Sequence, residues 1–127
     1  MKRDMDLIRK ILLKLENFTS DDNINKIEIE DFSHDQVAYH IYLLQDAGLI
    51  RAGILMDYGT AVPKITAING LTWAGHDFLD ASRDEGRWIK AKTVINEMKG
   101  ASFEIIKTVL IVLMKDQMTT ILSGKTI

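Results

Sequence analysis

Residues 39–50 have the sequence YHIYLLQDAGLI, which is typical of a helix that ends at a glycine and continues directly as a strand. Upstream, Ser33 is a good N-cap, and Ile41 and Leu44 share one face of the expected helix. Gly48 stands where a helix ends in the left-handed conformation that glycine adopts without strain. We therefore expect a helix that begins after Ser33 and ends before Gly48.

A β-hairpin is expected to follow this helix. Leu49–Met56 and Val62–Ile68 have the composition of strands, and Asp57-Tyr58-Gly59-Thr60 between them is typical of a turn. Asn69-Gly70 predicts a second turn, after which Thr72 is expected to cap a helix.

The remaining elements follow from the spacing of apolar residues. They are a first helix over Met5–Leu15, a short half-buried strand over Lys26–Glu30, a helix from Trp73 to about Arg83, and two helices over Trp88–Met98 and Phe103–Leu122. In the helix after Thr72, the expected apolar anchors are Trp73, Phe78 and Leu79. Glu85-Gly86 is expected to interrupt the helical pattern.

The order helix, short strand, helix, hairpin and helix is that of a winged helix. We therefore expect an α+β winged-helix domain over residues 1–85 and a helical C-terminal extension over residues 86–127. One departure concerns the positioning helix that normally precedes a recognition helix. Its place is taken by Asn17–Phe32, which is expected to form a loop and the short strand.

The chain also resembles a bacterial and phage family catalogued as domain of unknown function 2513. The resemblance lies in residues 1–9 (MKRDMDLIR), 37–40 (VAYH), 71–80 (LTWAGHDFLD) and 88–92 (WIKAK). It implies a winged-helix-like fold and a phage or prophage context, and it implies no particular activity.

Composition narrows the class of protein. The 127 residues are 46% apolar and include no cysteine, which excludes a disulfide framework, a thiolate nucleophile and a cysteine zinc site. The most apolar run, Ile105–Met114, is shorter than the roughly 20 residues of a membrane span, and the N-terminus has no signal-peptide pattern. We expect a soluble, cytoplasmic protein.

No catalytic pattern is found in the sequence. There is no Gly-rich phosphate loop and no nucleophile elbow, so we expect no enzymatic activity and no cofactor. His34 and His40 are six residues apart, which is not the spacing of two ligands on one helix face, so we expect no metal site. Instead, His40 and His76 are expected to make structural hydrogen bonds, His40 on the core side of its helix.

The distribution of charge bears on nucleic-acid binding. Residues 27–50 contain five Asp or Glu and no Lys or Arg, so the expected recognition helix lacks the cations that usually contact DNA. We expect a small bacterial or phage regulatory protein that binds DNA weakly and mostly without sequence preference. Its expected contact residues are Arg3, Lys10, Lys14, Tyr39, Tyr42, Arg51 and Lys64.

Two alternatives stay open for the outward face of this helix. In the first, its tyrosines and carboxylates bind a host or phage protein, because exposed tyrosines are common anchors at protein interfaces. The residues of that alternative interface are His34, Asp35, Tyr39, Tyr42 and Asp46. In the second, the C-terminal helices cover both tyrosine rings within the chain.

The last helix predicts self-association. It is apolar around most of its circumference, whereas a helix that covers one wall needs an apolar arc of little more than ~100°. We expect a homodimer, because a two-fold partner commonly covers such a surface. Its expected interface is Phe103, Ile106, Val109, Leu110 and Leu113. The alternative is a monomer in which this helix inserts between the first helix and Trp88.

Overall fold

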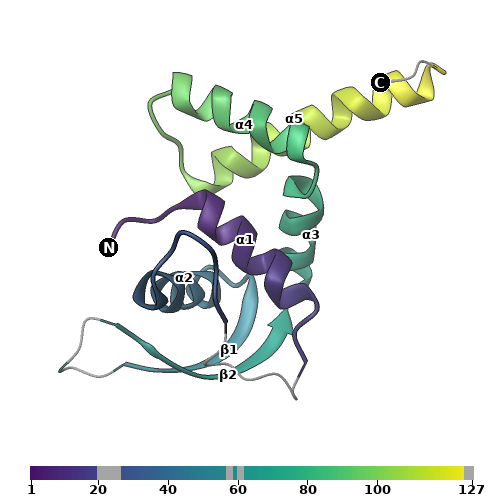
Figure 1. The fold of residues 1–127 in the computed structure, drawn as a ribbon. Coiled ribbons are helices and arrows are strands. Elements are labelled where there is room, and N and C mark those ends of the chain that lie inside the picture. Colours follow the sequence, from purple (N-terminus) through teal and green to yellow (C-terminus); the bar gives the residue numbers. More distant parts are fainter. Residues whose placement is uncertain (20–26, 57–58, 60–61, 125–127) are drawn as a thin grey trace. The chain divides into compact units, whose positions relative to one another are not determined.

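The computed structural model describes residues 1–19, 27–56, 59 and 62–124 (Figure 1). Within these residues the chain is an α+β protein with five helices and one antiparallel hairpin. The elements are α1 (Met5–Glu16), α2 (His34–Asp46), β1 (Ile50–Leu55), β2 (Lys64–Leu71), α3 (Trp73–Ser82), α4 (Glu85–Glu97) and α5 (Phe103–Leu122). None of these helices is both long and apolar enough to cross a membrane.

The chain divides into two compact units. The first comprises Met1–Leu79 and the second Asp80–Ile127, so the division falls within α3. In the first unit, α1 and α2 pack against each other and both contact the hairpin. In the second unit, α4 packs against α5. The boundary at residues 85 and 86 stays a prediction.

Polar caps begin the helices of the first unit where the sequence predicts them. The Asp4 carboxylate accepts a hydrogen bond from the amide of Leu7 at the start of α1. Ser33 and Gln36 form a reciprocal capping box at the start of α2, which satisfies two amides that a helix leaves unpaired.

A junction of two glycines joins α2 to α3 (the Leu49 junction). Gly48 has φ +75° and ends α2, and the Leu49 carbonyl accepts a hydrogen bond from the amide of Thr72. The Thr72 hydroxyl donates to the Gly48 carbonyl at 2.6 Å and accepts from the amide of Gly75 at 3.1 Å. Gly75 lies so close to Leu49 that a Cβ there would collide with the Leu49 carbonyl.

β2 ends three residues later than predicted, at Leu71, and the hairpin contains two bulges. Arg51 pairs with Gly70 but Ala52 pairs with Ile68, so Asn69 is an extra residue on β2. The prediction of a turn at Asn69-Gly70 is therefore wrong. The positive φ of Gly70, +115°, is accommodated by the bulge, and β2 continues to Leu71.

The predicted strand at Lys26–Glu30 is also wrong. Residues 27–29 have no regular structure and a turn begins at Glu30, while Lys26 lies outside the described residues. The alternation is real, because Ile27 is buried and the two glutamates are exposed. However, this segment pairs with neither strand, since the described sheet contains only β1 and β2.

The prediction that Trp73 is an apolar anchor is also wrong, because this residue is 83% exposed. Phe78 and Leu79 are buried as predicted. The buried face of α3 is formed by Gly75, Phe78, Leu79 and Ser82, at helical spacing. Trp73 lies on the other face with the exposed residues His76, Asp77 and Asp80.

In the second unit, α4 begins earlier than predicted. The Asp84 side chain accepts from the amide of Arg87, so Glu85-Gly86 opens the helix and does not interrupt it. The Arg87 guanidinium donates to the Gln117 side chain and to the carbonyls of Asp80 and Ala81. These bonds connect the end of α3, the first turn of α4 and the middle of α5.

Separate substitutions of Gly75 in α3 and Gly86 in α4 are expected to show the importance of the Leu49 junction. Gly75→Ala should lower the free energy of unfolding by more than about 2 kcal/mol, because the methyl group would push α3 away from the Leu49 carbonyl. Gly86→Ala is the matched control in the first turn of α4, where a Cβ meets only an ordinary contact, and it should stabilise by up to about 1 kcal/mol. Urea denaturation measures both changes, and equal effects would contradict the role of the junction.

Candidate functional site

Helix α2 has a buried face and a polar face. Val37, Ile41 and Leu44 are buried as their spacing predicts, and Ala38 is buried with them although the pattern had placed it on the outward face. The outward face carries the exposed residues His34, Asp35 and Asp46 and the half-buried residues Tyr39 and Tyr42.

The two tyrosines form a pair on this face. Their ring centroids are 6.2 Å apart, and the Tyr39 ring also meets the His40 ring edge-on at 5.7 Å. Because part of each ring is buried, its position is set before any partner binds. The exposed remainder is an amphipathic surface with a phenolic hydroxyl on each ring.

His40 has a structural role. Its Nε2 accepts a hydrogen bond from the amide of Asp4 at 2.8 Å, and its Nδ1 donates to the Gln36 carbonyl at 2.7 Å. Both ring nitrogens of the neutral imidazole are thereby used. His40 thus fastens the N-cap of α1 to α2, as its predicted core orientation implies.

The other histidines are placed differently. His34 and His76 are both exposed, and the Nδ1 of His34 lies 3.9 Å from the Asp35 carboxylate. Across the described part of the chain, no group of three or more His, Asp or Glu side chains is positioned to hold a metal ion. The structural hydrogen bond predicted for the His76 side chain is not found among the residues that the structure describes.

A surface hollow lies where α2 runs along β1, and we call it the α2–β1 edge. It is lined by Tyr42, Gln45, Asp46, Ile54 and Met56. The Gln45 side chain accepts from the Ala52 amide at 2.7 Å and so holds the helix beside the strand. The edge combines one carboxylate, one tyrosine and two apolar side chains.

Trp73 adds an exposed aromatic side chain to the first unit, two residues after Leu71, which pairs with Ile50 at the start of β1. It follows Thr72, whose hydroxyl binds the Gly48 carbonyl two residues beyond Asp46. Its exposure has a signal in the sequence, because residues three, four and seven positions later are His76, Asp77 and Asp80. That polar face indicates a solvent-facing tryptophan.

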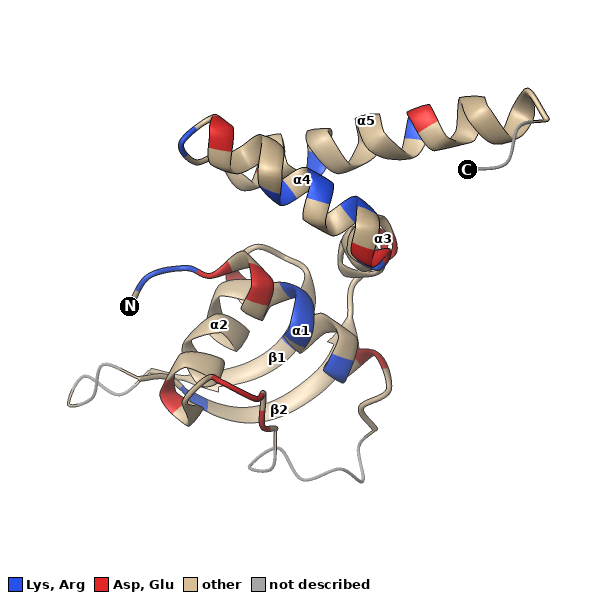
Figure 2. Ribbon diagram, turned by 45° about the horizontal axis from the view of Figure 1, so that its top comes forward, with Lys and Arg blue, Asp and Glu red and all other residues tan. Residues whose placement is uncertain are grey.

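The predicted basic residues on α1 lie beside other groups. Lys10 places its ammonium group 5.6 Å from the centre of the Phe32 ring. Lys14 lines a hollow together with Glu28 and Glu30. In Figure 2 the basic segments are spread over several elements, and α2 has none.

The other predicted phosphate contacts are also separated. Arg3 lies on the segment before α1, and the Arg51 guanidinium reaches the Leu71 carbonyl at 3.4 Å. Arg51 pairs with Gly70 and Lys64 pairs with Leu55, which places these two cations at opposite ends of the hairpin. The five predicted cations therefore do not form one cluster.

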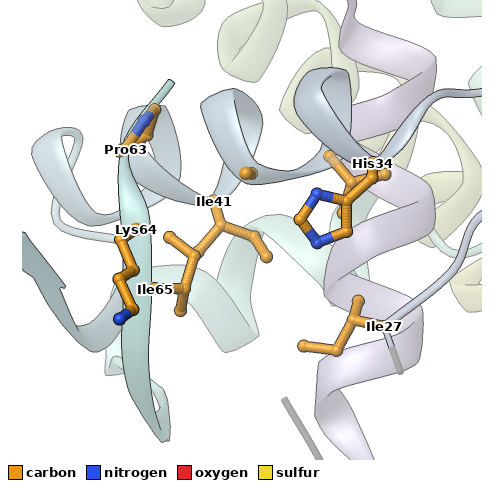
Figure 3. Close-up of a pocket in the computed structure, with 8 residues that line it drawn as sticks. Ile27, His34, Ile41, Pro63, Lys64 and Ile65 are labelled. Atoms are coloured by element: carbon orange, nitrogen blue, oxygen red, sulfur yellow. The ribbon is translucent and has the colours of Figure 1, made fainter. Parts of the chain in front are cut away.

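A small cavity lies between α2 and the start of β2 (Figure 3). Ile41 and His34 come from α2, and Pro63, Lys64 and Ile65 come from the other side, with Ile27 beside them. Its volume of about 80 Å³ is far below the roughly 300–1,000 Å³ of small-molecule sites, so it is not suited to a ligand of that size.

The predicted dimer residues of α5 are distributed over two environments. Ile106 and Leu110 are buried within the chain, and Phe103, Val109 and Leu113 are half-buried. The exposed large apolar side chains of α5 are instead Ile105, Ile111, Val112, Met118, Ile121 and Leu122.

Together, the fold and these surfaces define a small α+β protein in which a polar, tyrosine-bearing helix lies along a hairpin. The chain belongs to the family described as hypothetical protein (DUF2513), whose model matches residues 2–102. The predicted family resemblance is thereby confirmed. The match ends at Ser102, which is the N-cap of α5.

A relative in Haemophilus influenzae (strain Rd), described as an uncharacterized protein, is 39% identical over 111 residues. The aligned region covers 86% of this chain and 92% of that protein. No solved structure matches the chain.

Removing the His40 imidazole is expected to destabilise the first unit. His40→Leu leaves the Asp4 amide without its acceptor and should lower the free energy of unfolding by about 2–3 kcal/mol. His34→Leu, on the exposed end of the same helix, should change it by less than about 0.5 kcal/mol. Thermal denaturation followed by circular dichroism compares the two variants, and a small effect at His40 would argue against the structural role.

Proposed function

We propose that this protein acts by binding another protein through the α2–β1 edge and Trp73. The observation that carries the proposal is the composition of the outward side of α2. It presents two tyrosines and two carboxylates, has no Lys or Arg, and lies beside the apolar residues Ile54 and Met56.

These residue types suit a protein partner. Tryptophan and tyrosine supply much of the binding energy at protein interfaces, because each buries a large rigid surface around a polar atom. Tyr39 and Tyr42 are partly buried in the free chain, so binding immobilises less side-chain freedom. The carboxylates of Asp35 and Asp46 favour a partner whose surface is basic.

DNA binding is the second candidate, and the order of the elements favours it. We infer that the first unit is a winged-helix variant in which α2 takes the place of the recognition helix. The described residues before α2, 17–19 and 27–33, contain no positioning helix. A carboxylate-bearing α2 would meet repulsion from phosphates, and the separated cations described above offer little compensation.

Trp73→Ala is expected to weaken partner binding without affecting stability, because the side chain is almost fully exposed. Loss of an interface tryptophan typically costs at least ~2 kcal/mol, or roughly 30-fold in affinity. Wild-type and variant proteins are immobilised and exposed to extract of the source cells, and bound proteins are quantified by mass spectrometry. Leu55→Ala truncates an exposed apolar residue on the hairpin. It serves as a control for how much the loss of any exposed apolar side chain reduces the amount of bound protein.

The expected result is a protein retained by the wild type and by Lys10→Ala but depleted by Trp73→Ala and by Tyr42→Ala. Circular dichroism confirms that each variant is folded. If every captured protein is retained equally by all variants, the proposed site is wrong.

An electrophoretic shift titration tests the second candidate with random-sequence duplex DNA. We expect no shift with ~10 µM protein at about 50 mM salt, where phosphate contacts are strongest. A shift that is abolished by Lys10→Ala with Lys14→Ala, and unaffected by Trp73→Ala, would favour DNA over a protein partner.

A further inference from the structure

Helix α5 keeps an apolar stripe exposed after its buried face has been used. Ile106 and Leu110 face the interior of the chain, whereas Ile111, Met118 and Ile121 are 44%, 52% and 62% exposed. Leu122 at the end of the helix is 78% exposed. A helix that is buried on one side and apolar on another requires a second covering surface.

The stripe has the spacing of a helix–helix seam. Ile111, Met114, Met118 and Ile121 are separated by three, four and three residues, which is the a and d pattern of a coiled coil. We call these four residues the α5 seam. This spacing suits a second helix as the covering surface, because two such stripes interdigitate at the same interval.

The seam extends past the helix that supports α5. The side-chain bonds from Arg87 to Gln117 place the first turn of α4 beside the middle of α5. Residues 118–122 lie beyond that point, and both ribbon views show this end of α5 projecting past α4 (Figures 1 and 2). Half of the seam therefore has no α4 beside it.

We propose that the α5 seam pairs with the α5 seam of a second copy of this chain, with the two helices antiparallel. The order Ile, Met, Met, Ile is symmetric about Asp116. In an antiparallel pair centred there, Ile111 faces Ile121 of the other copy and Met114 faces Met118. The seam is therefore complementary to itself under a two-fold axis.

The charge of Lys107 disfavours the parallel orientation. Continuing the seam toward the N-terminus of α5 brings Lys107 to the next position, where it is 3.7 Å from Glu104 of its own helix. In a parallel pair, the two Lys107 ammonium groups would face each other across the interface. In the antiparallel pair they are about 27 Å apart, at 1.5 Å per residue along the helix.

The interface is expected to be weak. The seam and Leu122 comprise five side chains per chain, far fewer than the ~20–30 residues per partner of a standard stable interface. We therefore expect the dimer to dissociate in the micromolar range. This interface does not include Ile106 or Leu110, and it belongs to the second unit, whereas the α2–β1 edge belongs to the first.

Sedimentation equilibrium of the full chain between about 1 and 200 µM measures the association. The wild type is expected to shift from the 14.4 kDa monomer toward twice that mass over this range. Met118→Glu should raise the dissociation constant at least tenfold. Thr119→Glu, one residue away and off the seam, is the matched control and should leave it within about twofold.

Cysteine cross-linking tests the orientation, and the chain has no cysteine of its own. Under oxidation, an equal mixture of Ile111→Cys and Ile121→Cys chains should give a disulfide-linked heterodimer. Each variant alone should cross-link little, because identical positions are about 15 Å apart in the antiparallel pair.

Three results would overturn the proposal. A monomer throughout the concentration range would exclude the dimer. Efficient cross-linking of each single variant with itself would show a parallel pair. A dimer that is unaffected by Met118→Glu in a chain with wild-type helical content would place the interface elsewhere.

Discussion

The carbonyl group of Leu49 is the point on which the arrangement of the first unit depends. It accepts the amide of Thr72, and α3 can approach it only because residue 75 has no side chain. The end of α2, the start of β1, the end of β2 and the start of α3 therefore meet within a few residues. These contacts hold the hairpin beside α2. The α2–β1 edge therefore depends on the hydrogen bonds and close packing of the Leu49 junction.

Local chemistry accounts for the parts of the fold that the sequence predicts well. Ser33 and Thr72 cap helices as their positions indicate, and α5 spans the predicted residues, because caps and apolar spacing act over one or two turns. The failures concern pairing. Residues 27–30 alternate like a strand but do not join the described sheet, and Asn69-Gly70 becomes part of a bulge because β1 continues alongside it.

The sequence predicts which residue types the candidate site contains, but it does not predict which of them lie close together. The residue types of α2 follow from the sequence, and the polar face shared by Trp73, His76 and Asp77 marks an exposed tryptophan. The neighbours of the lysines do not follow, because Phe32 and the two glutamates reach Lys10 and Lys14 through a segment without regular structure. Such contacts depend on the path of the chain, which no local pattern specifies.

The hydrogen bond between Gln45 and Ala52 also makes the edge of β1 a poorer template for an added strand. A hairpin presents unpaired amides along its outer edge, and each can nucleate pairing with a strand from another molecule. The Gln45 amide oxygen occupies one of these donors, and the two bulges in β2 interrupt the regular ladder that a third strand would extend. A protein with so short a sheet thereby keeps an accessible edge in solution without offering it as a template for fibrous growth.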